Sequence, residues 1–358
     1  MTRPTILLGM PHVHDIFKTV EANLRHHGFE VINLVEDDQA FRYPSLWTRL
    51  HTKFRQHILG DKDAKRRIKA QLLKHSIGKK LQQHQGADYA LFISGDIYHP
   101  DLLAFIHPHI HHTMVNYQWD GLSRFPAIWQ CIAEFDRFYV FDADDLAHPQ
   151  HHFLPATNFY FDNDLTTPNQ NQTLYFTGTH QPNRAAIITQ FAQFAEQAQW
   201  ELDFRLVWAH NRNLKQARQT YPCANIHITH RGDSFQNNLQ RAKQAKVLVD
   251  FVTNAHKGLS FRTFEALGYQ KKLITTNPHT MDYDFYHSDN IYILQPDNLD
   301  GIQTFLDTPY HPIANEIREK YSFGNWIKYI LNIEPHQKIQ LPSHNVTPNQ
   351  PTNTSSYQ

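Results

Sequence analysis

Short apolar runs alternate with segments of helical periodicity along this chain, and this alternation restricts its possible folds more than any other feature. The first series begins with an apolar run at residues 6–8, a helical segment at 13–27 and a second apolar run at 31–35. Its later apolar runs are residues 89–93, 113–117 and 138–141. This pattern predicts a parallel sheet that is covered by helices on both faces.

The same alternation starts again at residue 173. The expected strands and helices of this second series are residues 173–177, 183–197, 204–208, 235–244, 247–251, 261–267 and 272–276. Between the two series, residues 162–172 contain little that could enter a core, so we expect a linker there. The sequence therefore predicts an α/β fold of two Rossmann-like, doubly wound domains, with the crevice between them as the default site.

The length of 358 residues fits two domains, since a domain usually takes roughly 100 to 200 residues. We place the first domain at residues 1–161, the linker at 162–172 and the second domain at 173–312. Residues 313–334 are expected to form a C-terminal helix that returns to the first domain. Residues 335–358 are mostly Pro, Asn, Gln, Ser and Thr, which predicts a disordered tail.

The charges of the chain balance. Lys and Arg total 34 and Asp and Glu total 34, whereas a general nucleic-acid binder usually carries a basic surplus. The sequence therefore disfavours nucleic acid as a partner. The 26 His make the protein cationic below neutral pH, and the cluster from His107 to His112 invites a metal site that nothing else in the chain requires.

One segment, from Arg49 to Lys80, is strongly basic, and only Asp61 and Asp63 oppose its positive charges. Its apolar residues fall at helical spacing. It is therefore either one or two amphipathic helices with a solvated cationic face, or a surface for anionic lipid headgroups or an anionic acceptor.

Several features indicate a cytoplasmic protein, and peripheral association with the inner face of the cell membrane stays open. The two cysteines, Cys131 and Cys223, suggest two buried thiols in a reducing compartment. The N-terminus lacks the pattern of a signal peptide, and no run of about 18 apolar residues occurs.

The segment with the clearest chemistry starts at Gly258, which follows an expected buried strand and opens a helix. The amides at a helix N-terminus bind anions, phosphate above all. Arg262 and Glu265 are three residues apart and share one helix face, so both could look into the crevice. The guanidinium suits a diphosphate and the carboxylate suits ribose hydroxyls. The alternative is an ion pair between the two on the helix surface.

This segment resembles the donor-binding segment of two-domain glycosyltransferases of the GT-B fold. The matching elements are Gly258-Leu259-Ser260, Glu265-Ala266-Leu267-Gly268, Lys271-Lys272 and Thr275-Thr276-Asn277. More narrowly, residues 258–268 with 284–286 resemble bacterial enzymes of lipopolysaccharide or capsule biosynthesis that are related to spore-maturation-type glycosyltransferases. Residues 117–126, 176–180 and 321–326 show a weaker likeness.

The resemblance implies transfer of a sugar from a nucleotide diphosphate sugar to a saccharide or glycolipid acceptor, without a metal or other cofactor. The second domain would bind the donor and the first the acceptor. The implied donor-binding residues are Gly178, Arg184, Gly258, Leu259, Ser260, Arg262 and Glu265, with Glu265 on the ribose and the others at the diphosphate. For Arg184 the alternative is an exposed arginine at a helix start.

Retaining members of this class carry a glutamate eight positions before the one that matches Glu265, and here that position is Lys257. The stereochemical outcome is therefore open. Lys257 could instead stabilise the departing nucleoside diphosphate. An inverting enzyme needs a general base from the first domain. We favour Asp120, with His12 and His14 as further candidates, although Asp120 could merely cap a loop.

Two other functions remain open at this stage. A sugar-nucleotide epimerase of the same fold would use the donor site without an acceptor. A non-enzymatic polyanion-binding protein would use the basic segment instead. The acidic run at residues 142–145 superficially fits a metal motif, but it lies in the wrong domain for the donor and is expected to be a structural loop.

Overall fold

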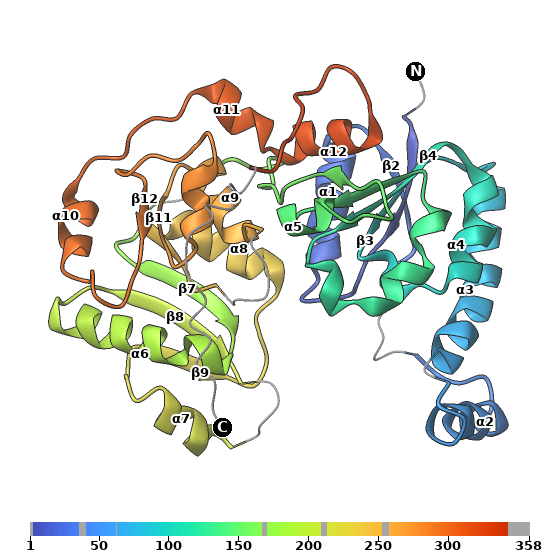
Figure 1. Ribbon diagram of the computed structural model, residues 1–358, viewed down its shortest axis with the longest axis horizontal. Helices are drawn as coiled ribbons and strands as arrows, with labels where there is room; N and C mark the ends of the chain where they lie inside the picture. Colours follow the sequence, from blue (N-terminus) through green and yellow to red (C-terminus); the bar gives the residue numbers. More distant parts are fainter. Residues whose placement is uncertain are drawn as a thin grey trace, which may run out of the picture.

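The computed structural model describes residues 3–35, 41–61, 63–166, 170–208, 213–252 and 258–342. These residues form two lobes, each built on a parallel sheet of six strands with helices on both faces, which confirms the predicted fold class (Figure 1). No helix among the described residues is long and apolar enough to cross a membrane.

The first sheet has the strand order β2-β1-β3-β4-β5-β6. Its strands are β1 (Thr5–Gly9), β2 (Glu30–Asn33), β3 (Ala87–Ile93), β4 (Ile110–Gln118), β5 (Arg137–Val140) and β6 (Leu154–Pro155). The helices of this lobe are α1 (Ile16–His26), α2 (Leu46–His57), α3 (Ala64–Gln83), α4 (Pro100–Ile106) and α5 (Ala143–Leu146). Because β1 lies between β2 and β3, the strand order reverses between β1 and β3, and ligands of such sheets bind at the carboxyl ends there.

The second sheet has the order β12-β11-β10-β7-β8-β9, so its reversal point lies between β7 and β10. Its strands are β7 (Leu174–Thr179), β8 (Leu202–Val207), β9 (Ile226–Thr229), β10 (Val247–Asp250), β11 (Lys272–Thr275) and β12 (Ile291–Ile293). The helices that follow in the chain are α6 (Pro182–Gln197), α7 (Leu214–Thr220), α8 (Phe235–Gln244), α9 (Phe261–Gly268), α10 (Gly301–Asp307), α11 (Asn315–Lys320) and α12 (Phe323–Leu331).

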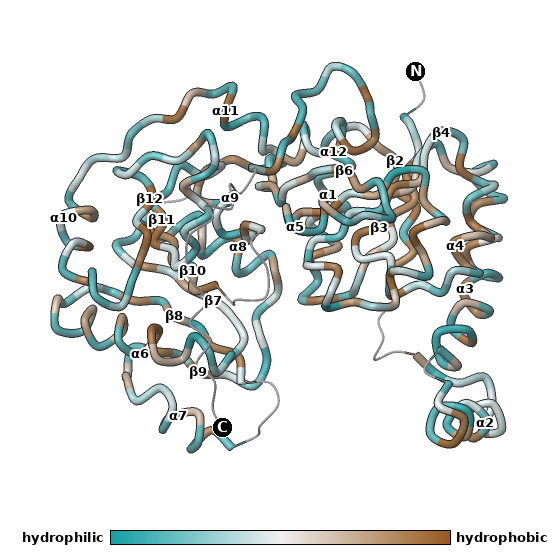
Figure 2. Tube along the Cα trace, viewed as in Figure 1, coloured by the Kyte–Doolittle hydropathy of each residue, from teal (hydrophilic) through white to brown (hydrophobic). Residues whose placement is uncertain are grey.

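Apolar side chains of the strands are buried on both faces of each sheet. Figure 2 shows the hydropathy of each residue along the trace. In the first lobe, Leu24 of α1 lies on one face and Leu73 of α3 on the other, each at most 6% exposed. Gly28 ends the loop after α1 with φ +91°, a left-handed conformation that suits glycine. The amphipathic spacing seen in the sequence therefore corresponds to helices packed on a sheet.

The chain crosses between the lobes at two places that lie side by side. The amide of Tyr160 donates to the carbonyl of Tyr321 at 3.1 Å, and the amide of Phe323 donates to the carbonyl of Tyr160 at 2.9 Å. After the second crossing, α12 packs on the first sheet, with the ring of Trp326 at 5.2 Å from that of Tyr117. These paired crossings fix the two lobes to one another at this end of the crevice.

The disordered tail expected from residue 335 differs from the structure in its first part. Residues 335–342 are described, and Ile339 is 1% exposed in the core of the first lobe. The side chain of Asn325 in α12 accepts from the amide of Gln337 at 2.7 Å and donates to its carbonyl at 3.0 Å. One apolar side chain and this two-bond contact hold the segment, although its composition is polar. Residues 343–358 lie outside the described residues.

Candidate functional site

A cavity of about 290 Å³ lies between the two lobes. The first lobe lines it with the loops that follow β1, β4 and β5, and the second lobe lines it with the starts of α8 and α9. The principal lining residues are His14, Trp119, Asp120, Phe141, Phe235, Ser260 and Phe261. Three residues that the sequence singled out, His14, Asp120 and Ser260, therefore meet at one interlobe cavity.

The loop after β1 carries His14 to the second lobe. His14 and Asp15 both have positive φ, 48° and 58°, which is rare for residues other than glycine and clusters at functional sites. The carbonyl of His14 accepts from the amide of Phe235 at 2.7 Å. A Cβ at Gly232 would lie only 2.7 Å from Cε1 of His14. The unusual backbone of this loop thus places an imidazole between the lobes.

Asp120 follows β4 and lines the interlobe cavity with a largely buried carboxylate. One of its oxygens accepts from the guanidinium of Arg124 at 2.6 Å and the other from the amide of Gly121 at 3.1 Å. Asp120 therefore caps its loop, and its carboxylate also lies where a substrate hydroxyl could reach it. His12 lines a second cavity, in the first lobe, and its Nε2 lies 3.3 Å from Asp15.

The start of α9 faces the first lobe. A Cβ at Gly258 would lie 2.8 Å from the carbonyl oxygen of Phe141, so only glycine allows this approach. The carbonyl of Leu259 accepts from the side chain of Asn158 at 2.9 Å. The hydroxyl of Ser260 donates to Asp250 at 2.7 Å, and no side chain caps α9. The positive end of this helix is therefore directed at the interlobe cavity. Lys257 lies outside the described residues.

Arg262 and Glu265 do not look into the crevice as we expected. They form an ion pair with each other, and their side chains are 12% and 3% exposed. The guanidinium also lies 5.0 Å above the ring of Tyr175 in β7. Desolvation by burial raises the pKa of Glu265, while the charge of Arg262 lowers it. An ion pair between Arg262 and Glu265 is the alternative that the sequence leaves open, and the structure shows this pair. It is buried under α9, however, and does not lie on the helix surface.

Arg184 lies at the point where the strand order of the second sheet reverses. Its guanidinium donates to the carbonyl of Phe251, just after β10, at 2.6 Å and to the carbonyl of Thr179 at the end of β7. A Cβ at Gly178 would lie 2.6 Å from this guanidinium, which explains the glycine. The side chain is half-buried, and desolvation lowers its pKa. The alternative of an exposed arginine is therefore excluded, and a fixed positive charge stands at the carboxyl ends of β7 and β10.

Asp250, Asn158 and Asp96 carry no sequence motif and were not predicted, and of these Asp250 and Asp96 lie outside the residues that line the interlobe cavity. Asp250 ends β10 and accepts from the hydroxyl of Ser260. The side chain of Asn158 accepts from the hydroxyl of Tyr117 at 2.9 Å and donates to the carbonyl of Leu259. Asp96 follows β3 and is 8% exposed, and burial raises its pKa from 3.8 to about 6. A single Asp or Asn after a strand belongs to no motif of defined spacing. These residues can therefore be identified only from the topology.

The acidic run at residues 142–145 is structural. Asp142 accepts from the amide of Asp144 at 3.1 Å and so caps α5, and Asp145 accepts from the amide of Leu122 at 3.0 Å. Elsewhere in the described chain, His287, Asp289 and His311 lie within reach of one ion. The two imidazoles stack at 3.8 Å with 5° between their planes. Because nitrogen lone pairs lie in the ring plane, stacked rings do not converge on one metal ion.

No protein-family model and no curated protein matches this sequence. Solved structures do match its fold. A protein assigned as a UDP-N-acetylglucosamine 2-epimerase from Listeria monocytogenes has a TM-score of 0.52 at 11% identity, over 94% of this chain and 100% of that chain.

Two structures of an alpha-glucosyltransferase also match. The complex with UDP has a TM-score of 0.51 at 9% identity, over 93% of this chain and 96% of that chain. The complex with UDP and a 13-mer DNA has a TM-score of 0.51 at 10% identity, over 89% and 90%. At identities this low, the structural similarity establishes only the fold. It is the two-lobed fold of GT-B glycosyltransferases.

Proposed function

We propose that this protein is a glycosyltransferase that moves a sugar from a nucleotide diphosphate sugar to a saccharide or glycolipid acceptor. The observation that carries the proposal is the fixed guanidinium of Arg184 at the reversal point of the second sheet, together with the uncapped start of α9 at the interlobe cavity. A cation and a helix N-terminus both bind phosphate. The resemblance of residues 258–268 to donor-binding segments supports the same assignment.

In this proposal the donor diphosphate binds to Arg184 and to the amides of Gly258, Leu259 and Ser260. The buried pair of Arg262 and Glu265 positions α9 against the second sheet instead of contacting the donor. The bond between the anomeric carbon and the diphosphate oxygen breaks, and the nucleoside diphosphate departs with the electron pair. The positive charge and the helix end stabilise it without a metal ion.

The acceptor side of the proposal uses the first lobe. The acceptor hydroxyl oxygen forms the new bond to the anomeric carbon, and Asp120 takes its proton as general base. This role is supported by the place of Asp120 on the cavity opposite Ser260. His14 is close enough to both lobes to orient the acceptor. The resemblance extends the proposal to cell-surface polysaccharides such as lipopolysaccharide or capsule, made at the inner face of the cell membrane.

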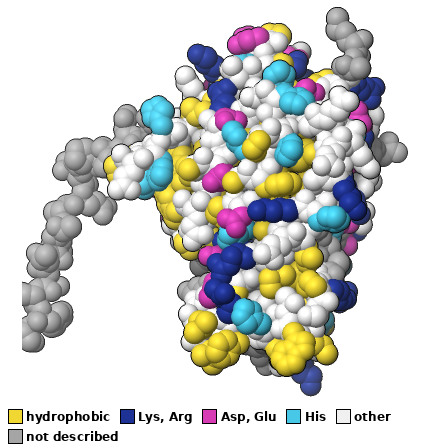
Figure 3. All heavy atoms as spheres, turned by 90° about the vertical axis from the view of Figure 1, so that its right-hand side faces the viewer, with side chains coloured by type: hydrophobic (Ala, Val, Ile, Leu, Met, Phe, Trp, Pro, Cys, Tyr) yellow, Lys and Arg dark blue, Asp and Glu magenta, His cyan; other side chains and the backbone are white. Residues whose placement is uncertain are grey.

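Peripheral contact with an anionic membrane through the segment from Arg49 to Lys80 is part of this proposal. In α2, Leu46 and Trp47 are 76% and 81% exposed, and Phe54 is 52% exposed. Figure 3 shows hydrophobic side chains beside Lys and Arg at the lower end of this face, where α2 lies. The helix contains no acidic residue. A basic helix with exposed apolar side chains is typical of an interfacial helix on anionic lipid.

The experiment is to incubate the protein with a panel of nucleotide diphosphate sugars, with and without saccharide acceptors, and to follow products by mass spectrometry and NMR. We expect release of a nucleoside diphosphate and transfer to an acceptor, with much slower turnover in Asp120→Asn. Epimerisation of a donor in the absence of acceptor would identify an epimerase instead. Failure of every donor to bind would overturn both enzymatic assignments.

A further inference from the structure

A second cavity, of about 390 Å³, lies within the first lobe and plays no part in the donor site. The loop after β1 lines one side with Pro11, His12 and Val13, and the segment after β3 lines it with Ile97, Tyr98 and His99. It therefore occupies the reversal point of the first sheet, between the carboxyl ends of β1 and β3. Open α/β sheets bind ligands at this position.

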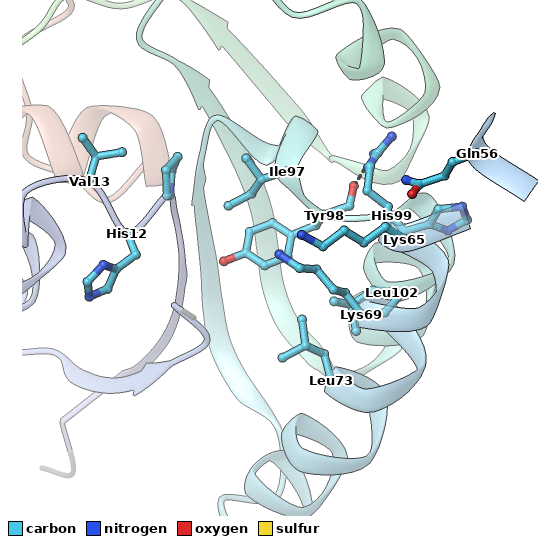
Figure 4. Close-up of a pocket in the computed structure, with 13 residues that line it drawn as sticks. His12, Val13, Gln56, Lys65, Lys69, Leu73, Ile97, Tyr98, His99 and Leu102 are labelled. Carbon is cyan, nitrogen blue, oxygen red and sulfur yellow. Dashed lines mark hydrogen bonds between the residues drawn. The ribbon is translucent and has the colours of Figure 1, made fainter. Parts of the chain in front are cut away.

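The opposite wall of this first-lobe cavity is cationic. Lys65 and Lys69, four residues apart on α3, extend side by side across it toward Tyr98 (Figure 4). Arg66 also lines the cavity, held by Asp63 at 2.7 Å and by the carbonyl of Tyr98 at 2.6 Å. None of the described residues that line the cavity is acidic.

These charges favour an anionic ligand. Both ammonium groups lie over the ring of Phe41, at 5.3 and 5.5 Å, and together with the guanidinium of Arg66 they make this wall attractive to an anion. They also lie in the first two turns of α3, where the helix dipole is positive. Desolvation by burial lowers the pKa of His99, whose Nδ1 accepts from the amide of Asp101 at 3.2 Å. Leu73 and Leu102 form an apolar floor, so the ligand must combine an anionic group with less polar parts.

The position of the first-lobe cavity relates it to the site of transfer. Val13 lines both this cavity and the interlobe cavity, so the two adjoin. At the other end, Gln56 of α2 contributes to the wall. A ligand in the cavity would therefore lie between the helix with the exposed apolar side chains and the place where the donor sugar is transferred.

We propose that this cavity binds the phosphate or diphosphate group of the acceptor, between Lys65, Lys69 and Arg66. The inference rests on the proposed transferase function, because it names the acceptor of that site as a phosphate ester. The same chemistry occurs in a lipid-linked sugar phosphate and in a free one. The lysines fix the anion, and the part to be glycosylated extends past Val13 into the interlobe cavity.

The test uses the full chain and two probes, inorganic pyrophosphate and geranyl diphosphate, titrated by calorimetry. The variant Lys65→Gln/Lys69→Gln removes the two ammonium groups, and Lys74→Gln/Lys79→Gln makes the same charge change farther along α3. We expect the first variant to bind at least about tenfold more weakly than wild type, and the second to bind like wild type. Thermal melting of both variants checks that they are folded.

The two probes distinguish the sources of the anion. Tighter binding of geranyl diphosphate than of pyrophosphate, abolished in Lys65→Gln/Lys69→Gln, supports a lipid-linked acceptor, and equal binding supports a free sugar phosphate. The proposal is overturned if neither probe binds, or if Arg184→Lys weakens binding while Lys65→Gln/Lys69→Gln does not, which places the anion in the donor site. Probe binding without binding of any donor in the nucleotide diphosphate sugar panel would leave the cavity assignment standing and refute the transferase.

Discussion

Replacing Glu265 by Gln tests the role assigned to the buried pair under α9. The change leaves the guanidinium of Arg262 in the interior without its counterion, since both side chains are at most 12% exposed. Removing one partner of a buried ion pair usually costs ~3–5 kcal/mol. Asp250 also acts on Arg262 electrostatically, so we expect a loss of about 3 kcal/mol, the lower end of that range.

The assay is urea unfolding followed by circular dichroism. Arg25→Gln breaks a surface ion pair of α1 with Glu21, and because Arg25 is 51% exposed this control should lose less than about 1 kcal/mol. The double variant Arg262→Met/Glu265→Leu replaces both charges by apolar side chains and should regain most of the stability, to within about 1 kcal/mol of wild type.

The double variant also separates structure from binding. If the pair only positions α9, Arg262→Met/Glu265→Leu should bind UDP about as tightly as wild type. A folded double variant that no longer binds UDP would show that Arg262 or Glu265 contacts the nucleotide, as the resemblance implies. A loss below about 1 kcal/mol in Glu265→Gln would refute the reasoning about burial.

Three further predictions concern other parts of the molecule. Asp96→Asn removes the carboxyl whose pKa burial raises from 3.8 to about 6, and at ~1.4 kcal/mol per pKa unit the variant should be about 3 kcal/mol more stable than wild type at pH 8. Because the fold disfavours the ionised carboxylate, this difference should grow as pH rises from 3.8 to 6, stay constant above that, and vanish below about pH 3 in urea unfolding. Gly268→Ala should lose ~1–3 kcal/mol, since its Cβ would lie 2.1 Å from the ring of Tyr160, and an unchanged melting temperature would contradict this contact. Trp47→Ser/Phe54→Ser should bind phosphatidylglycerol vesicles at least about tenfold more weakly in sedimentation, whereas wild-type binding that ignores lipid charge would argue against an anionic membrane.

The sequence predicted the architecture well because strand and helix periodicities are local. Both sheets and the position of Gly258 just before the start of α9 follow from runs of neighbouring residues. The direction in which a helix face points depends on tertiary packing, however, and not on neighbouring residues. The spacing of Arg262 and Glu265 put them on one face, but six residues of α9, from Thr263 to Gly268, are buried, so the helix has little surface left to turn toward the crevice.

Other parts of the site depend on contacts between distant segments. Asn158 stands alone after β6, and only the closeness of the lobes gives it a partner in the loop before α9. Asp250 ends β10, and the turn back to Ser260 within the second lobe gives it its partner. The cavity at Lys65 and Lys69 arises because α3 lies opposite the loops after β1 and β3. The basic composition of that segment left open a solvated cationic face or an anion-binding surface, and the position of the cavity was not visible before the topology was known.

The most direct test of the donor site is a calorimetric titration of UDP into wild type and Arg184→Lys. Lysine keeps the positive charge but cannot bridge the carbonyls of Phe251 and Thr179 as the guanidinium does. We predict that wild type binds UDP and that a folded Arg184→Lys binds it at least about tenfold more weakly, a difference of ~1.4 kcal/mol or more. Absence of UDP binding to wild type, or equal affinity of the two proteins, would contradict a donor site at the reversal point of the second sheet.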